Sequence, residues 1–595
     1  MDIEVEKKIQ ETIEYLKTVS KNELDLQHMD PIAKMMLVAV LHEGQKIKDY
    51  VDGVGDKIIE KFCENFIPRR EIQAMPALSI IETKFKQKKE VEAVTIGSGA
   101  SFSYKLGNKQ QINYLPIFNT LAIPYQNLCV LSHNKLVIGD NVYGVSVDKP
   151  NCMWLGIETK VEIEALKGLS IFIKGTKGVV PEHIYVGLED YELEFADMAK
   201  FEDIEMVEPF DAQQSSFQFF SIIENWKDVL FNMEDKAMLY VTDQIKDRDI
   251  FKQRTFPKVF QHWLESEQLD YFNENTIWLR LEFPEDFIIP DTCSILINTL
   301  PVVNVEINNV TLTQTSPIAK LQKQDNSYFL QVVETSTSSY KQGFNMANDE
   351  IIIRDFDASC YHAGNLYRDV RNIYNHFIDD YYAFIEYNGI KDGETIKQLR
   401  DVINRIGKAV GVSNSKYNFD SGTYVMKNMN QYQQSSSIKV SYSTTFGKLG
   451  NIPSVGETME NKKLPLIEKD VNIIVAGTGG TNKATVDERY ELLRYYSLTN
   501  DRLYTKKDIE AYLRKEIIAE FGKEEYKRIF IKMKIEGAAG ETKLQRGLYI
   551  TIEFKDKKNY EKAIDNLLTH RLAQKIKNKS CISMPINLSL LNLEN

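Results

Sequence analysis

Cysteine is scarce and scattered in this sequence. The 595 residues contain six cysteines, and no two of them form a C-x-x-C pair. This spacing excludes a zinc ribbon and a dithiol redox motif. Because each cysteine lies in an apolar strand-like or helical stretch, we expect buried free thiols in a reducing compartment. The six are Cys63, Cys129, Cys152, Cys293, Cys360 and Cys581.

Long apolar runs are also missing. The longest, MMLVAVL at residues 35–41, is far shorter than the ~20 residues that span a bilayer. The first residues, MDIEVEKKIQ, are acidic and amphipathic and do not resemble a signal peptide. We therefore expect a cytoplasmic protein with no direct membrane insertion.

Positive charge is not concentrated in any part of the chain. There are 73 Lys and Arg residues against 85 Asp and Glu, which gives a net charge of −12, and the basic residues are spread out. Proteins that bind nucleic acids gain most of their affinity by neutralising phosphates with basic side chains. The charge pattern therefore argues against a nucleic-acid partner.

The common catalytic motifs are absent as well. The sequence has neither the H-E-x-x-H zinc motif nor the G-x-S-x-G nucleophile turn. Cys360 and His362 would face the same way on a strand, but no second local pair completes a tetrahedral metal site. No pair of carboxylates stands out for acid–base chemistry. We predict a protein that is not an enzyme, with no catalytic residues, no cofactor and no metal.

One glycine cluster, Gly477-Thr478-Gly479-Gly480, raises the alternative of a nucleotide site. A Walker loop requires glycine before lysine, but Asn482 precedes Lys483; the same asparagine replaces the third glycine of a dinucleotide fingerprint. Thr485 and Glu488 form a capping box that satisfies the first amides of the following helix. We interpret the glycines as a mobile connection between a strand and a helix.

Length and composition are those of a soluble protein with several domains. Hydrophobic residues make up 43% of the chain and charged residues 27%. Hydrophobic periodicity predicts an α+β fold with N-terminal helices, central β-rich domains, an αα-hairpin and a C-terminal α/β domain. The predicted parts are a helical region at 1–72, β-rich domains at 73–205 and 206–362, the hairpin at 363–411, a polar linker at 412–437 and the last domain at 438–595.

Two sets of apolar residues at helical spacing are candidates for contact with partner chains. One stripe lies on the N-terminal helix and the other on the first helix of the hairpin. The same stripes would equally serve as the core of their own domain, and the sequence does not separate these two roles. The candidate interface residues are Ile9, Ile13, Leu16, Val370, Ile373, Phe377 and Tyr381.

An internal similarity links two β-rich segments. Residues 152–175 align without gaps on residues 276–299, and both read as strand, connection and strand. We interpret the pair as two related β-units; chance similarity between amphipathic strands is the alternative. The identical positions are Trp154/Trp278, Leu155/Leu279, Glu158/Glu282, Ser170/Ser294, Ile171/Ile295 and Ile173/Ile297.

The last domain shows a regular order of elements. Thr505 and Asp508 form a capping box before a helix, two alternating strands follow, and a further helix and a final strand close the domain. The order helix–strand–strand–helix–strand suggests a ferredoxin-like layer of helices on a sheet.

Three stretches resemble the TssF baseplate proteins of bacterial type VI secretion systems. They are residues 30–85, which begin with Asp-Pro and end in a PALSI strand entry, residues 277–321, and residues 479–517. The third is also similar to the C-terminal part of J-like phage baseplate wedge proteins. The most specific element is the run NTLPVVN at 298–304. Its family-signature residues are Asn298, Thr299, Pro301, Val302, Val303 and Asn304.

The resemblance implies a structural role in a baseplate wedge. It implies two copies of this chain in complex with TssG and TssE, arranged around the VgrG spike hub and docked through TssK on the inner-membrane complex. Such a role needs large shared surfaces and packing with two stable arrangements. A phage-tail or extracellular contractile-injection wedge protein is the nearest alternative, and a cytosolic nucleotide-binding enzyme is the alternative from another class.

Overall fold

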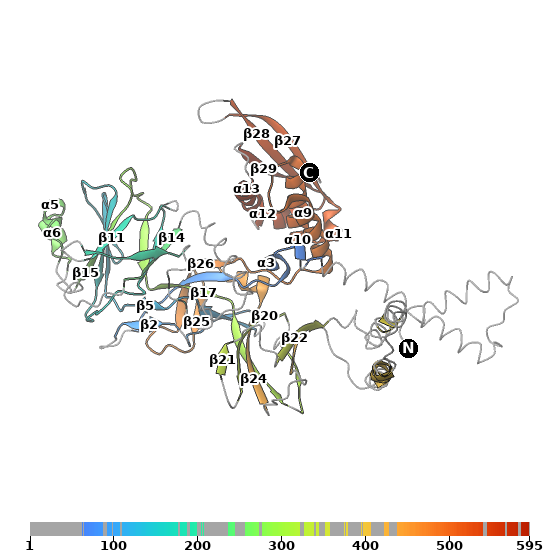
Figure 1. Cartoon of the computed structure of the whole chain (residues 1–595). Coiled ribbons are helices and arrows are strands. Elements are labelled where there is room, and N and C mark those ends of the chain that lie inside the picture. The colour runs from blue at the N-terminus through green and yellow to red at the C-terminus, as the bar shows by residue number, and fades with distance from the viewer. Residues whose placement is uncertain are drawn as a thin grey trace, which may run out of the picture. The chain divides into compact units, whose positions relative to one another are not determined.

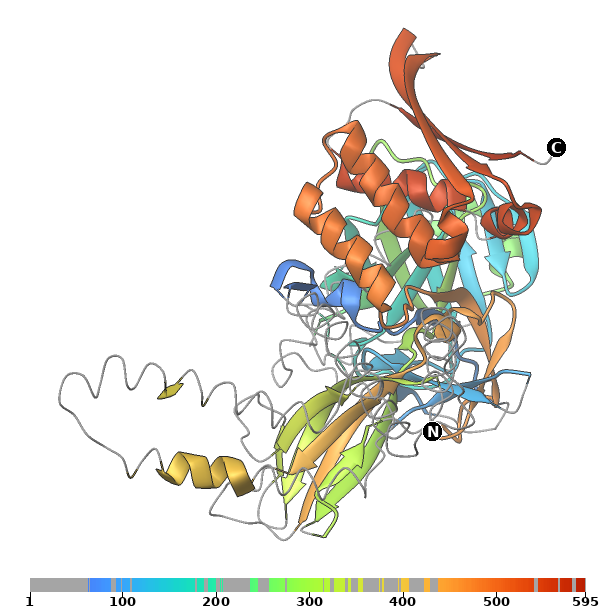
Figure 2. The same ribbon diagram turned by 90° about the vertical axis from the view of Figure 1, so that its right-hand side faces the viewer.

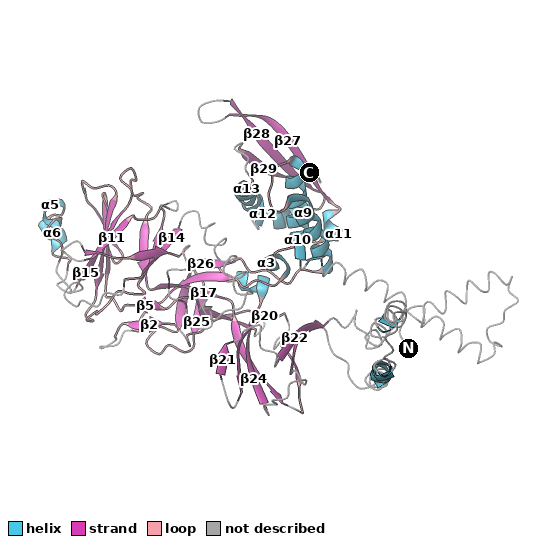
Figure 3. Cartoon of the chain, viewed as in Figure 1, coloured by secondary structure: helices cyan, strands magenta, loops and turns pink. Residues whose placement is uncertain are grey.

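The structure, a computed structural model, describes residues 62–198, 236–243, 256–356, parts of 374–405, 422–427 and 437–593, with short gaps inside these ranges, and Ile204 and Met206. These residues fall into two compact units. The strand-rich unit comprises Pro68–Ile352 and Val425–Ala484, and the C-terminal unit comprises Met1–Ile67, Ile353–Tyr424 and Thr485–Asn595. Strands and helices are both present, as predicted, and strands predominate (Figures 1 and 3).

A closed six-stranded barrel lies in the strand-rich unit. Its strands, in order around the barrel, are β1 (Leu78–Glu82), β17 (Thr299–Val303), β4 (Gln111–Pro116), β3 (Phe102–Lys105), β25 (Thr458–Asn461) and β26 (Asp470–Thr478). Buried and half-buried residues alternate along β4 and β26, as expected for strands with one face towards a core. The barrel combines strands from three of the predicted domains, so the boundaries predicted at 205/206 and 437/438 fall between strands of one closed sheet.

Two further sheets of this unit share one apolar core. One sheet has the order β12 (Tyr191–Glu192), β11 (His183–Val186), β15 (Thr276–Glu282), β9 (Cys152–Glu158), β6 (Leu128–Leu131), β7 (Lys135–Ile138) and β8 (Asn141–Gly144). The other has the order β13 (Phe195–Asp197), β14 (Lys236–Val241), β10 (Ser170–Lys174) and β16 (Ser294–Ile297). Side chains from β9 and β15 meet side chains from β10 and β16 in this core, which makes the pair a sandwich.

The two similar segments lie side by side in both sheets. Strand β9 pairs antiparallel with β15 so that Leu155 is opposite Leu279, and β10 pairs antiparallel with β16 so that Phe172 is opposite Leu296. Leu155 and Leu279, like Phe172 and Leu296, are also aligned with each other when residues 152–175 are laid on residues 276–299. An antiparallel pair centred on equivalent residues has local two-fold symmetry, so one approximate two-fold relation describes the pairing in both sheets.

Two short helices cover the two aligned tryptophans. They are α5 (Phe260–Trp263) and α6 (Ser266–Leu269). The ring of Phe260 packs edge-on against Trp154 at 5.2 Å and against Trp278 at 4.9 Å. Because one side chain makes nearly the same contact with both tryptophans, Phe260 lies close to the local two-fold axis.

The rest of the strand-rich unit is built from smaller elements. A four-stranded sheet has the order β18 (Glu306–Thr313), β24 (Ser437–Thr445), β20 (Tyr328–Thr337) and β21 (Lys341–Gly343). Strands β2 (Val94–Ile96) and β5 (Thr120–Ala122) form a separate pair. The remaining elements are α3 (Arg69–Ile72), β19 (Ile318–Lys320) and the 3-10 turn η3 (Gly447–Asn451).

The polar linker predicted at 412–437 needs a correction. The chain leaves the strand-rich unit in β22 (Ile351–Phe356) and returns to it in β23 (Gly422–Lys427), which lies inside the predicted linker. Thr423, Val425 and Lys427 are buried in β23 and alternate with half-buried residues. Only Val425 of these three is apolar, so hydrophobic periodicity does not reveal the strand. Residues 412–421 and 428–436 lie outside the described residues.

The end of the chain follows the predicted order of elements, except that the single helix predicted before the last strand is two helices. Helices α9 (Val486–Thr499), α10 (Lys506–Phe521) and α11 (Lys523–Tyr526) precede the hairpin β27 (Ile529–Ala539) and β28 (Leu544–Phe554). Helices α12 (Lys557–Asp565) and α13 (Leu568–Lys579) then lead to β29 (Ile586–Asn592), which pairs parallel with β28. The two long strands twist around each other beside the helices (Figure 2). The ferredoxin-like assignment itself stays a prediction.

Candidate functional site

The signature run NTLPVVN forms barrel strand β17 and the residue at each of its ends. Asn298 precedes the strand with φ of 55°, a left-handed conformation that asparagine tolerates better than most residues. Its side chain accepts a hydrogen bond from the N–H of Ile123 and donates one to the carbonyl of the same residue, both at 2.8 Å. Its own carbonyl accepts hydrogen bonds from the N–H and the hydroxyl of Thr83. Asn298 therefore joins two other segments to the start of β17.

Asn304 has the corresponding role after the strand and is also buried. Its amide nitrogen donates to the carbonyl of Asn113 at 3.0 Å, and its side-chain oxygen accepts from the Thr445 hydroxyl at 3.0 Å and the Phe446 N–H at 2.9 Å. Its backbone N–H donates to the carbonyl of Ala77 at 2.8 Å. Replacing this side chain leaves several buried polar groups without partners, which costs about 1–3 kcal/mol for each.

The residues between the two asparagines are buried in the barrel wall. Val302 faces the barrel core, and its neighbour Val303 faces the adjoining apolar cluster. The carbonyl of Pro301 accepts the N–H of Ile117 at 3.1 Å, and the hydroxyl of Ser170 donates to the carbonyl of Thr299. The signature run is therefore a structural element at the junction of barrel and sandwich. The hydrogen bonds of its two buried asparagines fix both of its ends.

The glycine cluster packs against the 3-10 turn η3. A Cβ atom on Gly477 would overlap the carbonyl oxygen of Gly450, and one on Gly480 would overlap that of Gly447. The side chain of Asn451 donates to the carbonyl of Gly480 and accepts from its N–H, both at 2.8 Å. The glycines are needed because two backbones approach each other closely here.

The backbone amides of this segment are occupied by acceptors from the protein itself. Gly477 donates to the carbonyl of Pro453 at 3.0 Å, and Thr481 donates to the carbonyl of Met75 at 3.0 Å. A phosphate cradle requires such N–H groups to point at the ligand. The prediction of a mobile connection is wrong, because the segment is fixed by packing and hydrogen bonds.

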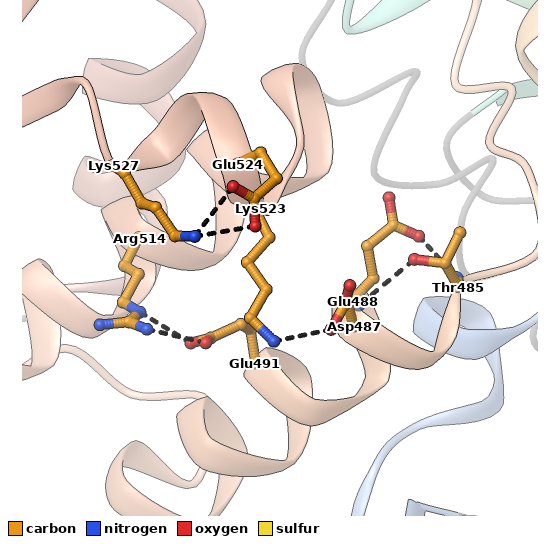
Figure 4. A network of polar contacts seen from close by, with 8 residues as sticks. All are labelled: Thr485, Asp487, Glu488, Glu491, Arg514, Lys523, Glu524 and Lys527. Atoms are coloured by element: carbon orange, nitrogen blue, oxygen red, sulfur yellow. Dashed lines mark hydrogen bonds and ion pairs between the residues drawn. The ribbon is translucent and has the colours of Figure 1, made fainter. Parts of the chain in front are cut away.

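The start of α9 is capped as the sequence predicts. The Thr485 hydroxyl accepts the Glu488 N–H at 3.3 Å, and the Glu488 carboxylate accepts the Thr485 N–H at 2.7 Å (Figure 4). The second capping box, of Thr505 and Asp508 before α10, is present too. Both boxes satisfy amides that a bound anion would otherwise use.

Charged residues connect α9 to α10 and α11 (Figure 4). The guanidinium of Arg514 donates two hydrogen bonds of 2.8 Å to the largely buried carboxylate of Glu491, and this pairing raises the pKa of Arg514. Lys523 pairs with Asp487 at 2.7 Å. The bidentate pair is the stronger of these contacts because its geometry is fixed and partly shielded from water. The arrangement joins helices to each other and leaves no converging acid and base for catalysis.

Most of the candidate interface residues lie outside the described residues. This holds for Ile9, Ile13, Leu16, Val370, Ile373 and Tyr381. Phe377 is described, is helical, and has 41% of its surface exposed. Arg400 donates to the hydroxyl of Tyr374 at 3.2 Å, so the two halves of the predicted αα-hairpin contact each other at this point. The interface itself stays a prediction.

The buried cysteines have the character predicted for them. Cys63, Cys129, Cys152 and Cys293 are free and buried, while Cys360, His362 and Cys581 lie outside the described residues. Burial raises the pKa of Cys129 to about 12 and that of Cys293 to about 11. A thiol with such a pKa is protonated at neutral pH and is a poor nucleophile.

Two further features are absent from the residues that the structure describes. Among those residues, no group of three or more His, Cys, Asp or Glu side chains is arranged to hold a metal ion. Within the same residues, no helix has the length and apolar character needed to cross a membrane.

Comparison with known proteins finds similarity among solved structures only. No family model and no curated protein matches the chain. A chain of the type VI secretion system TssK-TssF-TssG baseplate subcomplex is similar at 9% identity and a TM-score of 0.39, over 94% of this chain and 96% of that one. A chain of the anti-feeding prophage baseplate has 9% identity and a TM-score of 0.29, over 98% of this chain and 70% of that one. A chain of the baseplate complex from the type VI secretion system has 12% identity and a TM-score of 0.31, over 97% and 93% of the two chains.

Proposed function

We propose that this chain is a structural, non-enzymatic subunit of the baseplate wedge of a type VI secretion system. The observation that carries the proposal is the sequence resemblance to TssF proteins, above all the run at 298–304. That run is a buried barrel strand with a hydrogen-bonding asparagine at each end, so it is a part of the fold that a related protein would need to retain.

The chemistry of the described residues agrees with a structural role. The space beside the glycines at 477–480 is occupied by the protein's own backbone, which disfavours the alternative of a nucleotide-binding enzyme. The four described cysteines are buried, and burial raises the thiol pKa of three of them, Cys129, Cys152 and Cys293.

The proposal includes specific partners and a location. TssG and TssK are the first partners to test, followed by TssE, the VgrG spike hub and a second copy of this chain. The subunit would act in the cytoplasm, in a baseplate docked at the inner-membrane complex, where wedges hold the sheath and rearrange on firing. A wedge protein of a phage-like particle, such as an anti-feeding prophage, is the second candidate within the same structural class.

Co-expression with the products of neighbouring genes tests the proposal. The expected result, by native mass spectrometry, is a stable complex with two copies of this chain and one copy of a second protein. A lone monomer, or a chain that carries a co-purified nucleotide, would contradict the wedge assignment. The identity of the neighbouring proteins separates a secretion system from a phage-like particle.

A substitution in the predicted hairpin tests the candidate interface. We expect Phe377→Glu to prevent assembly with the partner while the isolated chain keeps its melting temperature, because this side chain is exposed. The matched control is Val402→Glu, at a residue with a similar exposed fraction of 45% on the other helical segment. Unfolding of the isolated Phe377→Glu chain would instead assign Phe377 to the core of its own domain.

A further inference from the structure

The seven-stranded sheet of the sandwich ends in the short strand β8. The N–H of Val145, just after β8, donates to the carbonyl of Asn134 at 3.2 Å, so the odd-numbered residues of this segment face β7. The backbone groups of the even-numbered residues Val142, Gly144 and Ser146 therefore face away from the sheet, and we call these three residues the β8 edge. All three are exposed, and among the described residues no strand pairs with them.

The segment that carries the β8 edge is uncharged and has apolar side chains on both faces. Residues 141–147, NVYGVSV, contain neither the charges nor the proline with which natural proteins usually block edge pairing. Val142 is 68% exposed on one face. On the other face Tyr143 is half-buried, and its ring lies 5.2 Å from the ring of Tyr271, which is itself half exposed. A further strand would remove apolar surface on both faces from water.

The glycine at the centre of the β8 edge is not required by the packing of the described residues. Gly144 is not among the glycines with a left-handed φ, and a Cβ atom on it would meet no heavy atom within 4 Å beyond its chain neighbours. Glycine weakens a strand, and it often marks a place where another backbone approaches closely. An occupant that lies against the β8 edge would account for this glycine.

Carboxylates lie at both ends of the β8 edge. Asp140 precedes β8, Asp148 follows the segment, and both are exposed. Asp291 lies at the same end as Asp148, where its carbonyl accepts a hydrogen bond from the ammonium of Lys135 at 2.6 Å. Lys149 is exposed at this end as well. Three carboxylates thus face two cations, one of which is held by backbone carbonyls, so the electrostatic complement of this edge is a strand with basic ends.

We propose that the β8 edge is a docking site for an extended strand of a partner protein, with basic residues at both ends and uncharged, largely apolar residues between them. The strand joins the sheet beside β8 and makes about six backbone hydrogen bonds with the N–H and C=O groups of the three edge residues. Its central side chains cover Val142 on one face and Tyr143 on the other. Its basic ends lie beside Asp140 and Asp148.

The acidic ends disfavour a second copy of this chain as the occupant. Two β8 strands paired antiparallel about Gly144 would place Asp140 of each copy opposite Asp148 of the other. Like charges directly opposite each other destabilise a strand pair. The inference goes beyond the proposed function, since it gives the chemistry of one partner segment and the edge that receives it.

A synthetic peptide tests the proposal on the isolated chain. The probe is the fluorescein-labelled peptide KRVTVTVRK, which in extended form has the length of residues 140–148. We expect saturable binding in fluorescence anisotropy. We also expect hydrogen exchange at the amides of the β8 edge to slow about tenfold or more when the peptide is added. The amide of Tyr143 faces β7 and should be protected both before and after the addition.

Substitutions separate the backbone pairing from the charge. Ser146→Pro removes an outward N–H and leaves the hydrogen bonds to β7 in place, so it should raise the Kd of the peptide about tenfold. The matched control, Ser146→Ala, should leave the Kd unchanged. Asp140→Lys together with Asp148→Lys should also raise it about tenfold, and this variant should instead bind a peptide with glutamates in place of the four basic residues.

Four outcomes would overturn the proposal. The first is a wild-type chain that does not bind the peptide at ~100 µM, and the second is unchanged hydrogen exchange at the β8 edge. The third is a Ser146→Pro chain that keeps the wild-type circular dichroism spectrum and binds as tightly as the wild type. The fourth is protection of the β8 edge in dimers formed without peptide, which would assign the edge to a second copy. Because the test needs no product of neighbouring genes, its failure is distinct from failure of wedge assembly.

Discussion

The two similar segments, residues 152–175 and 276–299, pair in register but carry very different residues at one aligned position beside their tryptophans. The first unit has Gly156 where the second has Arg280. Gly156 lies opposite Trp278, and a Cβ atom on it would be 2.6 Å from the indole ring. Arg280 lies opposite Trp154 and places its guanidinium carbon 5.4 Å from the centre of that ring. Trp278 therefore packs on a bare backbone, whereas the aligned Trp154 packs under a cation.

The difference makes the packing around the two aligned tryptophans asymmetric. A side chain at the local two-fold axis cannot be repeated, and Phe260 takes that place against both tryptophans. The strands specify which units pair, while Gly156, Arg280 and Phe260 fix how the covering helices pack on them. Substitutions at these three residues should therefore differ in cost according to how much packing each one controls.

The largest effect should come from Phe260. Phe260→Ala leaves a cavity between the two tryptophans and should lower the free energy of unfolding of the strand-rich unit by about 3–5 kcal/mol. Denaturant titration monitored by tryptophan fluorescence measures this loss. The control is Tyr271→Ala, at a half-exposed neighbour, which should cost far less. A loss below about 1 kcal/mol at Phe260 would mean that the aromatic cluster repacks freely.

The next effect should come from the glycine of the first unit. Gly156→Ala forces the Trp278 ring to move and should cost about 1–3 kcal/mol. In a double-mutant cycle, Trp278→Leu should remove most of that cost, because the smaller side chain gives the new methyl group room. Additive losses in the cycle would show that the methyl group clashes with something other than Trp278.

A smaller effect should come from the arginine of the second unit. Arg280→Met keeps the apolar stem but removes the cation over Trp154 and over Tyr185, whose ring centre is 4.5 Å from the guanidinium carbon. We expect a loss of about 0.5–2 kcal/mol in the same titration. Arg280→Lys should recover part of it, because lysine keeps the charge without the planar stacking. Equal losses for both variants would assign the effect to stacking rather than to charge.

The smallest effect should be a pH dependence beside the second unit. Strand β11 pairs with β15, and His183 on β11 lies 2.6 Å from the Glu192 carboxylate on β12, which raises the pKa of His183. A raised pKa means that the contact is fully present below the ordinary histidine pKa of ~6.5 and is lost as pH rises through the folded-state value. Because both side chains are about half exposed, the contribution is small.

Hydrogen-exchange protection factors for Tyr191 and Leu193, the residues whose N–H groups face β11, measure this pH dependence locally. We expect protection of β12 to fall between pH 6 and pH 8 in the wild type and to stay constant in His183→Gln. An unchanged wild-type profile would show that the backbone pairing of β12 does not depend on the histidine.

Local features of the fold were predictable from the sequence where a short pattern has one physical meaning. The capping boxes at Thr485 and Thr505 place a hydroxyl and a carboxylate where only a helix start uses both. The similarity of residues 152–175 to residues 276–299 identified strands that the structure pairs in register. The free, buried state of four cysteines followed from their apolar surroundings.

Features that depend on distant partners were not predictable. The closed barrel unites strands from residues 78 to 478, and no local periodicity encodes such pairings. The glycines at 477–480 looked like a mobile joint because their packing partners, Gly447 and Gly450, lie in another segment. The roles of Asn298 and Asn304 were not predictable for the same reason, since their hydrogen-bond partners are far away in the sequence.

Closure of the barrel also has a consequence for synthesis of the protein. Strand β1 pairs on one side with β17 and on the other with β26, where Leu78 lies opposite Thr478. At ~5–20 residues per second, a ribosome needs tens of seconds to make the chain between these two residues. During that time the edge of β1 that pairs with β26 has no partner strand. We therefore expect the nascent chain to depend on chaperones until β26 has emerged.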